Sequence, residues 1–151
     1  MEEKVARTLK QLHDNHPHSK NPSVEKYFSC FTDNARFLGT ESGNNWNMAQ
    51  YREYLAPMYK SDVRIIPVKP QEDSRKISIC GTSFASFDEV LLGYDAQGEV
   101  RSELRGSGSM VFDSAQDAWR IVLYHLSVPI PNDAALAVSR QLQQPPPAGC
   151  P

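Results

Sequence analysis

The chain has 151 residues, and single domains commonly hold about 100–150, so two full domains are not expected. Hydrophobic residues make up 40% and charged residues 23%, which is typical of a chain that folds around one packed core. Sixteen Lys and Arg against eighteen Asp and Glu leave a formal net charge of −2, and the basic residues are scattered. This balance excludes a general nucleic-acid binder, and no stretch reaches the roughly 18 apolar residues of a membrane span.

The predicted location is cytoplasmic. Charged residues alternate with apolar ones at the N-terminus, unlike the pattern of a signal peptide. The three cysteines, Cys30, Cys80 and Cys150, are odd in number and widely spaced, which fits reduced thiols rather than a disulfide framework.

Two helices are predicted in the first thirty residues. Apolar residues recur at helical spacing over residues 5–16. A second helix is predicted to begin with Asn21 as its cap and Pro22 in its first turn, and its apolar stripe includes Phe31. Residues 35–40 then read as a short strand.

A third helix has a well-marked start. Asn47 is placed to cap it, and Gln50, three residues later, is placed to reach back to the cap. Trp46 and Tyr51 are spaced as a hydrophobic staple across this start.

Residues after 62 change to the period of strands. β-Branched and aromatic residues gather in five runs separated by turn residues: 63–68, 76–80, 83–94, 99–113 and 119–128. Helix, helix, strand, helix and then a run of strands predicts an α+β fold, with a curved, cone-shaped antiparallel sheet of four to six strands and three helices on its concave face. A short helix is expected over residues 132–142, so the domain covers 1–142 and the Pro-rich tail 143–151 is expected to be disordered.

A homodimer follows from this arrangement. The helices bury one face of the sheet, and in so short a chain a second copy is the simplest cover for the other face.

Several short motifs carry a family resemblance. They are Tyr27-Phe28 with Phe31, Phe37–Thr40, Trp46, Phe87–Glu89, Arg105–Gly108, Trp119, Tyr124–Ser127 and Pro129–Asn132. Together with the helix order they make residues 5–132 resemble the SnoaL-like branch of the nuclear-transport-factor-2-like superfamily. The resemblance implies a conical α+β barrel with an interior pocket, usually dimerised through the outer face of its sheet. It does not imply one chemistry.

Two adjacent acids lie in the apolar run 83–92. Because strand side chains alternate, Glu89 is predicted to face the pocket and Asp88 the outer face. Enclosure by apolar neighbours would raise the pKa of Glu89 and suit it as a general base next to a carbonyl group. The alternative is a buried acid paired with an arginine or a tyrosine.

The sequence Arg105-Gly-Ser-Gly places two glycines on one face of a strand. These glycines either allow the sheet to bend or leave room for a ligand. Arg105 is predicted to share the outer face with Asp88, where the two could form an ion pair at a dimer contact.

On the last strand, Tyr124 is predicted to share a face with Val122 and Leu126, and to present its hydroxyl to the cavity. His125 is predicted to share the other face with Ile121. It is either an acid–base group or a hydrogen-bonded core or interface residue.

The first helix ends in a histidine cluster. His13 and His16 are spaced to meet on one helical face, but Pro17 interrupts the helix before His18 can join them, so no metal site is predicted. His13 is instead expected to line the cone.

The remaining candidates are apolar and aromatic residues that either line the pocket or belong to the core: Phe37, Trp46, Tyr51, Tyr54, Phe87, Met110 and Leu126. Phosphate loops and dinucleotide fingerprints are missing, so no cofactor is expected. The sequence therefore predicts a protein that binds a small hydrophobic organic molecule, with cofactor-free isomerase, cyclase or dehydratase chemistry in which Glu89 is the base and Tyr124 or His13 orients the substrate. The alternative is a non-catalytic ligand-binding or dimerisation module.

Overall fold

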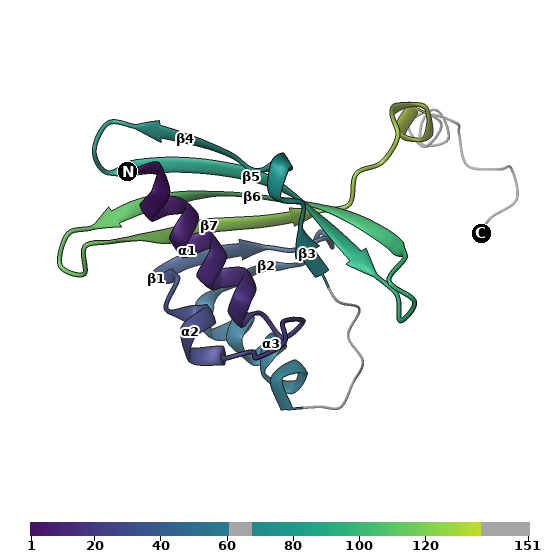
Figure 1. The fold of residues 1–151 in the computed structure, drawn as a ribbon, viewed down its shortest axis with the longest axis horizontal. Helices are drawn as coiled ribbons and strands as arrows, with labels where there is room; N and C mark the ends of the chain where they lie inside the picture. The colour runs from purple at the N-terminus through teal and green to yellow at the C-terminus, as the bar shows by residue number, and fades with distance from the viewer. Residues whose placement is uncertain (61–67, 137–151) are drawn as a thin grey trace, which may run out of the picture.

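The computed structural model describes residues 1–60 and 68–136, in which helices cover one face of a curved sheet (Figure 1). The elements in chain order are α1 (Glu2–Asn15), α2 (Val24–Phe28), β1 (Phe31–Leu38), β2 (Asn45–Asn47), α3 (Met48–Lys60), β3 (Val68–Pro70), the 3₁₀ helix η1 (Glu72–Ser74), β4 (Lys76–Cys80), β5 (Phe84–Tyr94), β6 (Val100–Asp113) and β7 (Ala118–Ser127). Residues 132–136 are helical. The rest of the helix predicted to end at 142, the tail 143–151 and nearly all of the strand predicted at 63–68 lie outside the described residues.

The strands form one mixed sheet in the order β2-β1-β7-β6-β5-β3, and β4 also pairs with β5. The predicted hairpins are confirmed, since β5, β6 and β7 pair antiparallel with their neighbours in sequence. The sheet differs from the prediction in having seven strands and in pairing β1 parallel to β7. The α+β class, with helices on one face of a curved sheet, is confirmed.

The core lies between the helices and the sheet. α1 contributes Val5, Leu9 and Leu12, all of them at most 1% exposed, and packs against β7 and β4. α3 packs on β1 and β2. Among the described residues, no helix is long and apolar enough to cross a membrane.

The predicted start of α3 is confirmed in detail. The backbone N–H of Gln50 donates to Oδ1 of Asn47 at 2.9 Å, and the backbone N–H of Asn47 donates to Oε1 of Gln50 at 3.0 Å. Each side chain thus satisfies a backbone donor that the first helical turn leaves free. The rings of Trp46 and Tyr51 lie 6.4 Å apart across this start.

The predicted second helix was wrong at both ends. Ser23, not Asn21, caps α2, accepting from the backbone N–H of Lys26 at 3.4 Å. The helix ends at Phe28, and Phe31 begins β1 instead of continuing the helical stripe. A contact with a distant strand ends the helix, because the carbonyl of Cys30 accepts a hydrogen bond from the N–H of Ile121 on β7.

A bulge changes the faces of β7. Leu123 pairs with Ser109 and Ile121 pairs with Met110, so Val122 is an extra residue between two regular pairs. Ile121 consequently lies on the inner face with Tyr124 and is 0% exposed, whereas simple alternation placed it on the outer face with His125.

Gly106 and Gly108 of β6 lie where other groups approach the strand too closely for a larger side chain. A Cβ on Gly108 would lie 2.3 Å from the carbonyl oxygen of Leu123 and 2.8 Å from carbons of the Phe87 ring. A Cβ on Gly106 would lie 3.3 Å from both the Glu89 side chain and the Tyr124 hydroxyl. Neither glycine is among the residues found to line the cavity described below.

We expect Gly108→Ala to lower the free energy of unfolding by about 2–3 kcal/mol, because the added methyl group meets backbone that cannot move aside. Gly43→Ala is the matched control, since its Cβ would meet nothing within 4 Å, and it should change stability by less than about 0.5 kcal/mol. Urea unfolding at neutral pH measures both. Equal effects of the two substitutions would contradict this account of the glycine.

Candidate functional site

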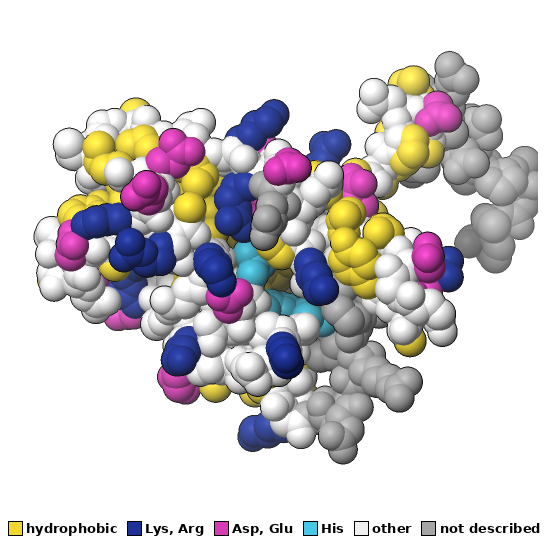
Figure 2. Space-filling model, viewed as in Figure 1, with side chains coloured by type: hydrophobic (Ala, Val, Ile, Leu, Met, Phe, Trp, Pro, Cys, Tyr) yellow, Lys and Arg dark blue, Asp and Glu magenta, His cyan; other side chains and the backbone are white. Residues whose placement is uncertain are grey.

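A cavity of about 340 Å³ opens between the helices and the inner face of the sheet. Figure 2 shows histidine side chains inside a hollow on this side of the molecule. The described residues that line it come from both layers and are mostly apolar or aromatic: Leu12, His13, His16, His18, Tyr27, Phe37, Gly39, Thr40, Asn44, Trp46, Tyr51, Tyr54, Leu55, Met58, Val68, Leu91, Leu104, Tyr124 and Leu126.

Most of the predicted pocket residues lie on this wall, namely His13, Tyr124, Phe37, Trp46, Tyr51, Tyr54 and Leu126. Phe87 and Met110 were also predicted to line the pocket, but neither is among the described residues that line this cavity. The Phe87 ring fills the space over Gly108, and Met110 is 0% exposed beside Ala85 and Ile121.

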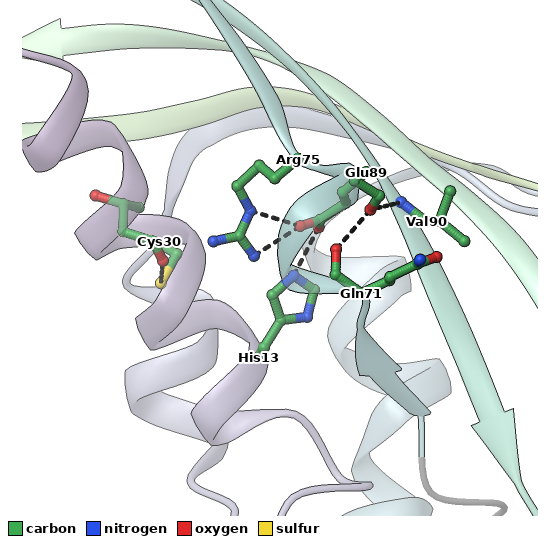
Figure 3. Close-up of polar contacts among 8 residues, drawn as sticks. His13, Cys30, Gln71, Arg75, Glu89 and Val90 are labelled. Atoms are coloured by element: carbon green, nitrogen blue, oxygen red, sulfur yellow. Dashed lines mark hydrogen bonds and ion pairs between the residues drawn. The ribbon is translucent and has the colours of Figure 1, made fainter.

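Glu89 is not among the described residues that line the cavity, and its carboxylate contacts two side chains, His13 and Arg75 (Figure 3). Its Oε1 lies 2.6 Å from Nε2 of His13 on α1. Its Oε2 accepts from Nε of Arg75 at 2.9 Å and lies 2.7 Å from the same guanidinium's second nitrogen. The Glu89 side chain is 0% exposed, so both oxygens are satisfied by protein alone.

The expected raised pKa of Glu89 was wrong. Burial by itself would raise this pKa, but the hydrogen bond and charge of His13, followed by the charge and hydrogen bond of Arg75, outweigh it and lower the pKa. Glu89 is therefore ionised, and it is not among the described residues that contact the cavity. The alternative given by the sequence, a buried acid paired with an arginine, describes it better than a free general base.

Arg75 lies at the gap between two short strands, β3 and β4, that pair with the same edge of β5. β3 pairs with Leu91–Gly93 and β4 with Phe84–Asp88, on the same edge. Between them, the backbone of Val90 bonds to the η1 segment: its carbonyl accepts from the N–H of Gln71, and its N–H donates to Oγ of Ser74, both at 2.8 Å. Arg75 follows directly and turns inward (Figure 3).

Of the three residues Glu89, Arg75 and His13, only His13 is among the described residues that line the cavity. Because ionised Glu89 can only accept, Nε2 of His13 must donate, and in the neutral form of the ring this leaves Nδ1 unprotonated. His13 lines the cavity, and Figure 3 shows Nδ1 on the side of the ring away from Glu89. The arrangement thus positions a proton acceptor, with a buried anion behind it.

The other two histidines of the cluster also reach the cavity, which sequence reasoning missed. Burial, followed by the charges of His18 and His13, lowers the pKa of His16 well below its usual value. Burial lowers the pKa of His18 to about 4. Both rings are therefore neutral at pH 7, and among the described residues no group of three His, Cys, Asp or Glu side chains is arranged to hold a metal ion.

Aromatic rings form another part of the wall. Phe37 and Tyr51 stack with centroids 3.8 Å apart, and Trp46 lies 5.9 Å from Phe37. The hydroxyls of Tyr27 and Tyr51 are hydrogen-bonded at 2.7 Å. Burial, then the negative charge of Glu89, raises the pKa of Tyr124 well above its usual value, so its hydroxyl is a donor at neutral pH.

Asp88, Arg105 and His125 lie on the other face of the sheet. Asp88 pairs with Ser107, whereas Arg105 lies between Val90 and Ser127. The expected Asp88–Arg105 ion pair is not formed, although both residues are described.

Comparisons with known proteins agree with this architecture. A family model described as a SnoaL-like domain matches residues 8–131. The chain is similar in structure to a domain of unknown function with a cystatin-like fold from Nostoc punctiforme (TM-score 0.72, 11% identity, 95% of this chain and 86% of that one). It is also similar to a "putative ketosteroid isomerase" from Shewanella frigidimarina (TM-score 0.63, 13% identity, 82% and 94%). At these identities the likeness shows the fold alone, and no curated protein matches the chain.

We expect Glu89→Gln to lower the free energy of unfolding by about 3 kcal/mol at pH 7, because it leaves Arg75 charged and partly buried without its anion. Since the folded pKa of Glu89 lies below the unfolded value of about 4.3, this stabilisation is complete above pH 4.3 and is lost as the pH falls through the folded pKa. The difference between wild type and variant should therefore shrink in acid.

Urea unfolding from pH 7 to pH 3 measures this difference. Protonation of His16 and His18 in acid affects the stability of both proteins alike, so it does not contribute to the difference. The control is Asp88→Asn, which neutralises the exposed neighbour on the opposite face and should cost less than about 0.5 kcal/mol. A difference for Glu89→Gln that does not depend on pH would show that the carboxylate charge stabilises nothing.

Proposed function

This chain belongs to the SnoaL-like family, and on that premise we propose that it binds a small, largely apolar carbonyl compound in the cavity and moves a proton next to the carbonyl without a cofactor. The observation that carries the proposal is the position of His13, which lines the cavity while its Nε2 contacts buried, ionised Glu89.

The cavity wall suits an uncharged ligand. Its volume of about 340 Å³ lies at the lower end of the usual range of roughly 300–1,000 Å³ for small-molecule sites. Among the described residues that line it there is no Asp, Glu, Lys or Arg. Stacked aromatic rings such as Phe37 and Tyr51 favour a flat molecule.

The proton transfer uses three groups. Nδ1 of His13 takes a proton from the carbon beside the carbonyl, and the C–H electron pair forms a carbon–carbon double bond as charge moves to the carbonyl oxygen. The Tyr124 hydroxyl donates a hydrogen bond to that oxygen. Glu89 stabilises the imidazolium formed on His13, and return of the proton to carbon completes an isomerisation or exchange.

Hydrogen–deuterium exchange tests this step. With 2-acetonaphthone in D₂O, we expect the protein to accelerate loss of the methyl proton signal in ¹H NMR spectra. His13→Gln should slow the catalysed exchange by about 100-fold, because it removes the proton acceptor. His125→Gln, the same change on the opposite face of the sheet, should leave the rate unchanged.

Calorimetric titration with the same ketone separates binding from chemistry. Binding without exchange would identify the alternative, a non-catalytic ligand-binding module of this fold. No binding at millimolar ketone would overturn the proposed ligand class.

We also propose a homodimer formed through the outer face of the sheet. Helices α1–α3 all lie on the other face (Figure 1), and the outer face presents half-buried apolar residues, Val90, Leu92 and Leu123, beside Arg105 and His125. A second copy would remove these side chains from water.

Light scattering at micromolar concentration should give the mass of two chains, and Leu123→Glu should give the mass of one because it places a charge in the contact. Glu99→Leu, a charge change at the exposed β5–β6 turn, is the control and should stay dimeric. A wild-type mass of one chain would overturn the dimer.

A further inference from the structure

Two histidines at the end of α1, His13 and His16, line the cavity, and the ring nitrogens that remain for a ligand differ in hydrogen-bonding role. In its neutral form the His13 ring donates Nε2–H to Glu89 at 2.6 Å, and Nδ1 is then an acceptor. This form of the ring can accept a hydrogen bond from a ligand at Nδ1 but cannot donate one there.

His16 is held in the same tautomer by a different contact. The backbone N–H of His18 donates to Nδ1 of His16 at 3.3 Å, so Nδ1 is unprotonated and Nε2 carries the hydrogen. The ring stacks on His18 at 4.5 Å and meets the edge of Tyr27 at 5.4 Å, which fixes its orientation. Among the described residues Nε2 of His16 has no hydrogen-bond partner, and His16 lines the cavity.

The two rings are three residues apart at one end of a helix, where side chains are neighbours. From this geometry we propose that His13 and His16 together bind one uncharged polar group of a ligand, in which a hydrogen-bond donor lies beside an acceptor. The donor of the ligand bonds to Nδ1 of His13, and its acceptor bonds to Nε2–H of His16. The inference rests on the proposed function and names its substrate class.

A carbonyl with a neighbouring O–H or N–H group meets this requirement, as in a hydroxy-ketone, an enolised diketone or a carboxamide. A carboxylate offers only acceptors and would face the lone pair of His13, whereas an ammonium group offers only donors. In the proposed reaction, His16 becomes a second donor, with Tyr124, toward the oxygen on which charge develops.

The tautomers are tested first, on the uniformly ¹⁵N-labelled wild-type chain at pH 8. Long-range ¹H–¹⁵N spectra distinguish the protonated from the unprotonated ring nitrogen. We expect both rings protonated at Nε2 only. A proton on Nδ1 of either ring would overturn the proposal, and this measurement needs neither a ligand nor a variant.

Recognition is tested with two flat, uncharged probes of one shape. 2-Naphthamide carries a carbonyl and an N–H donor, whereas 2-acetonaphthone replaces the NH₂ with a methyl group and keeps only the carbonyl. His13→Phe should weaken binding of the amide by about two- to tenfold more than it weakens binding of the ketone. His16→Phe should weaken both probes by a similar factor, because both carbonyls lose the same donor.

His125→Phe, the same change on the opposite face of the sheet, should alter neither affinity. Equal losses of the two probes in His13→Phe would overturn the donor–acceptor assignment. If neither probe binds the wild type, the proposed ligand class fails, and the tautomer measurement still decides the arrangement of the histidines.

Discussion

The site depends on one buried interaction, the contact of the Glu89 carboxylate with Arg75 and His13. An ionised carboxylate with no exposed surface is tolerated only if charged or hydrogen-bonding partners replace water. The partners come from α1 and from the junction of η1 with β4, whereas Glu89 lies in the middle of β5. The interaction therefore connects α1 and the junction of η1 with β4 to the middle of β5.

The same contact sets the chemistry that the cavity offers. Both oxygens of Glu89 are used behind the wall, so the carboxylate does not meet a ligand directly. Its charge acts through His13, whose Nε2–H it accepts, so that the neutral form of this ring has its lone pair on Nδ1. Arg75 keeps Glu89 ionised, and Gly106 leaves the space in which the carboxylate and the Tyr124 hydroxyl approach the same strand. The result is a positioned histidine in a wall whose described residues include no Asp, Glu, Lys or Arg.

Local patterns predicted much of this from sequence. The Asn47–Gln50 capping box and the faces of Asp88 and Glu89 follow from helix and strand periods that no distant contact alters here. Arg75 was missed because its partner is set by pairing: β3 and β4 share an edge of β5, and no spacing in the sequence reveals the break between them. Ile121 was misplaced because a bulge one residue away reverses the alternation.

The error on the pKa of Glu89 has a more general cause. Alternation on a strand identifies a buried face, and burial alone raises the pKa of a carboxyl group, but its partners decide the sign of the shift. For Glu89 the partners lie 76 and 14 residues away along the chain, so no local pattern contains them. Once they are present, Glu89 and Arg75 lie outside the set of described lining residues, and the rings of His13, His16 and Tyr124 are among the polar groups of the cavity wall. That separation accounts for a cavity suited to an uncharged ligand although a buried ion pair lies directly beneath its wall.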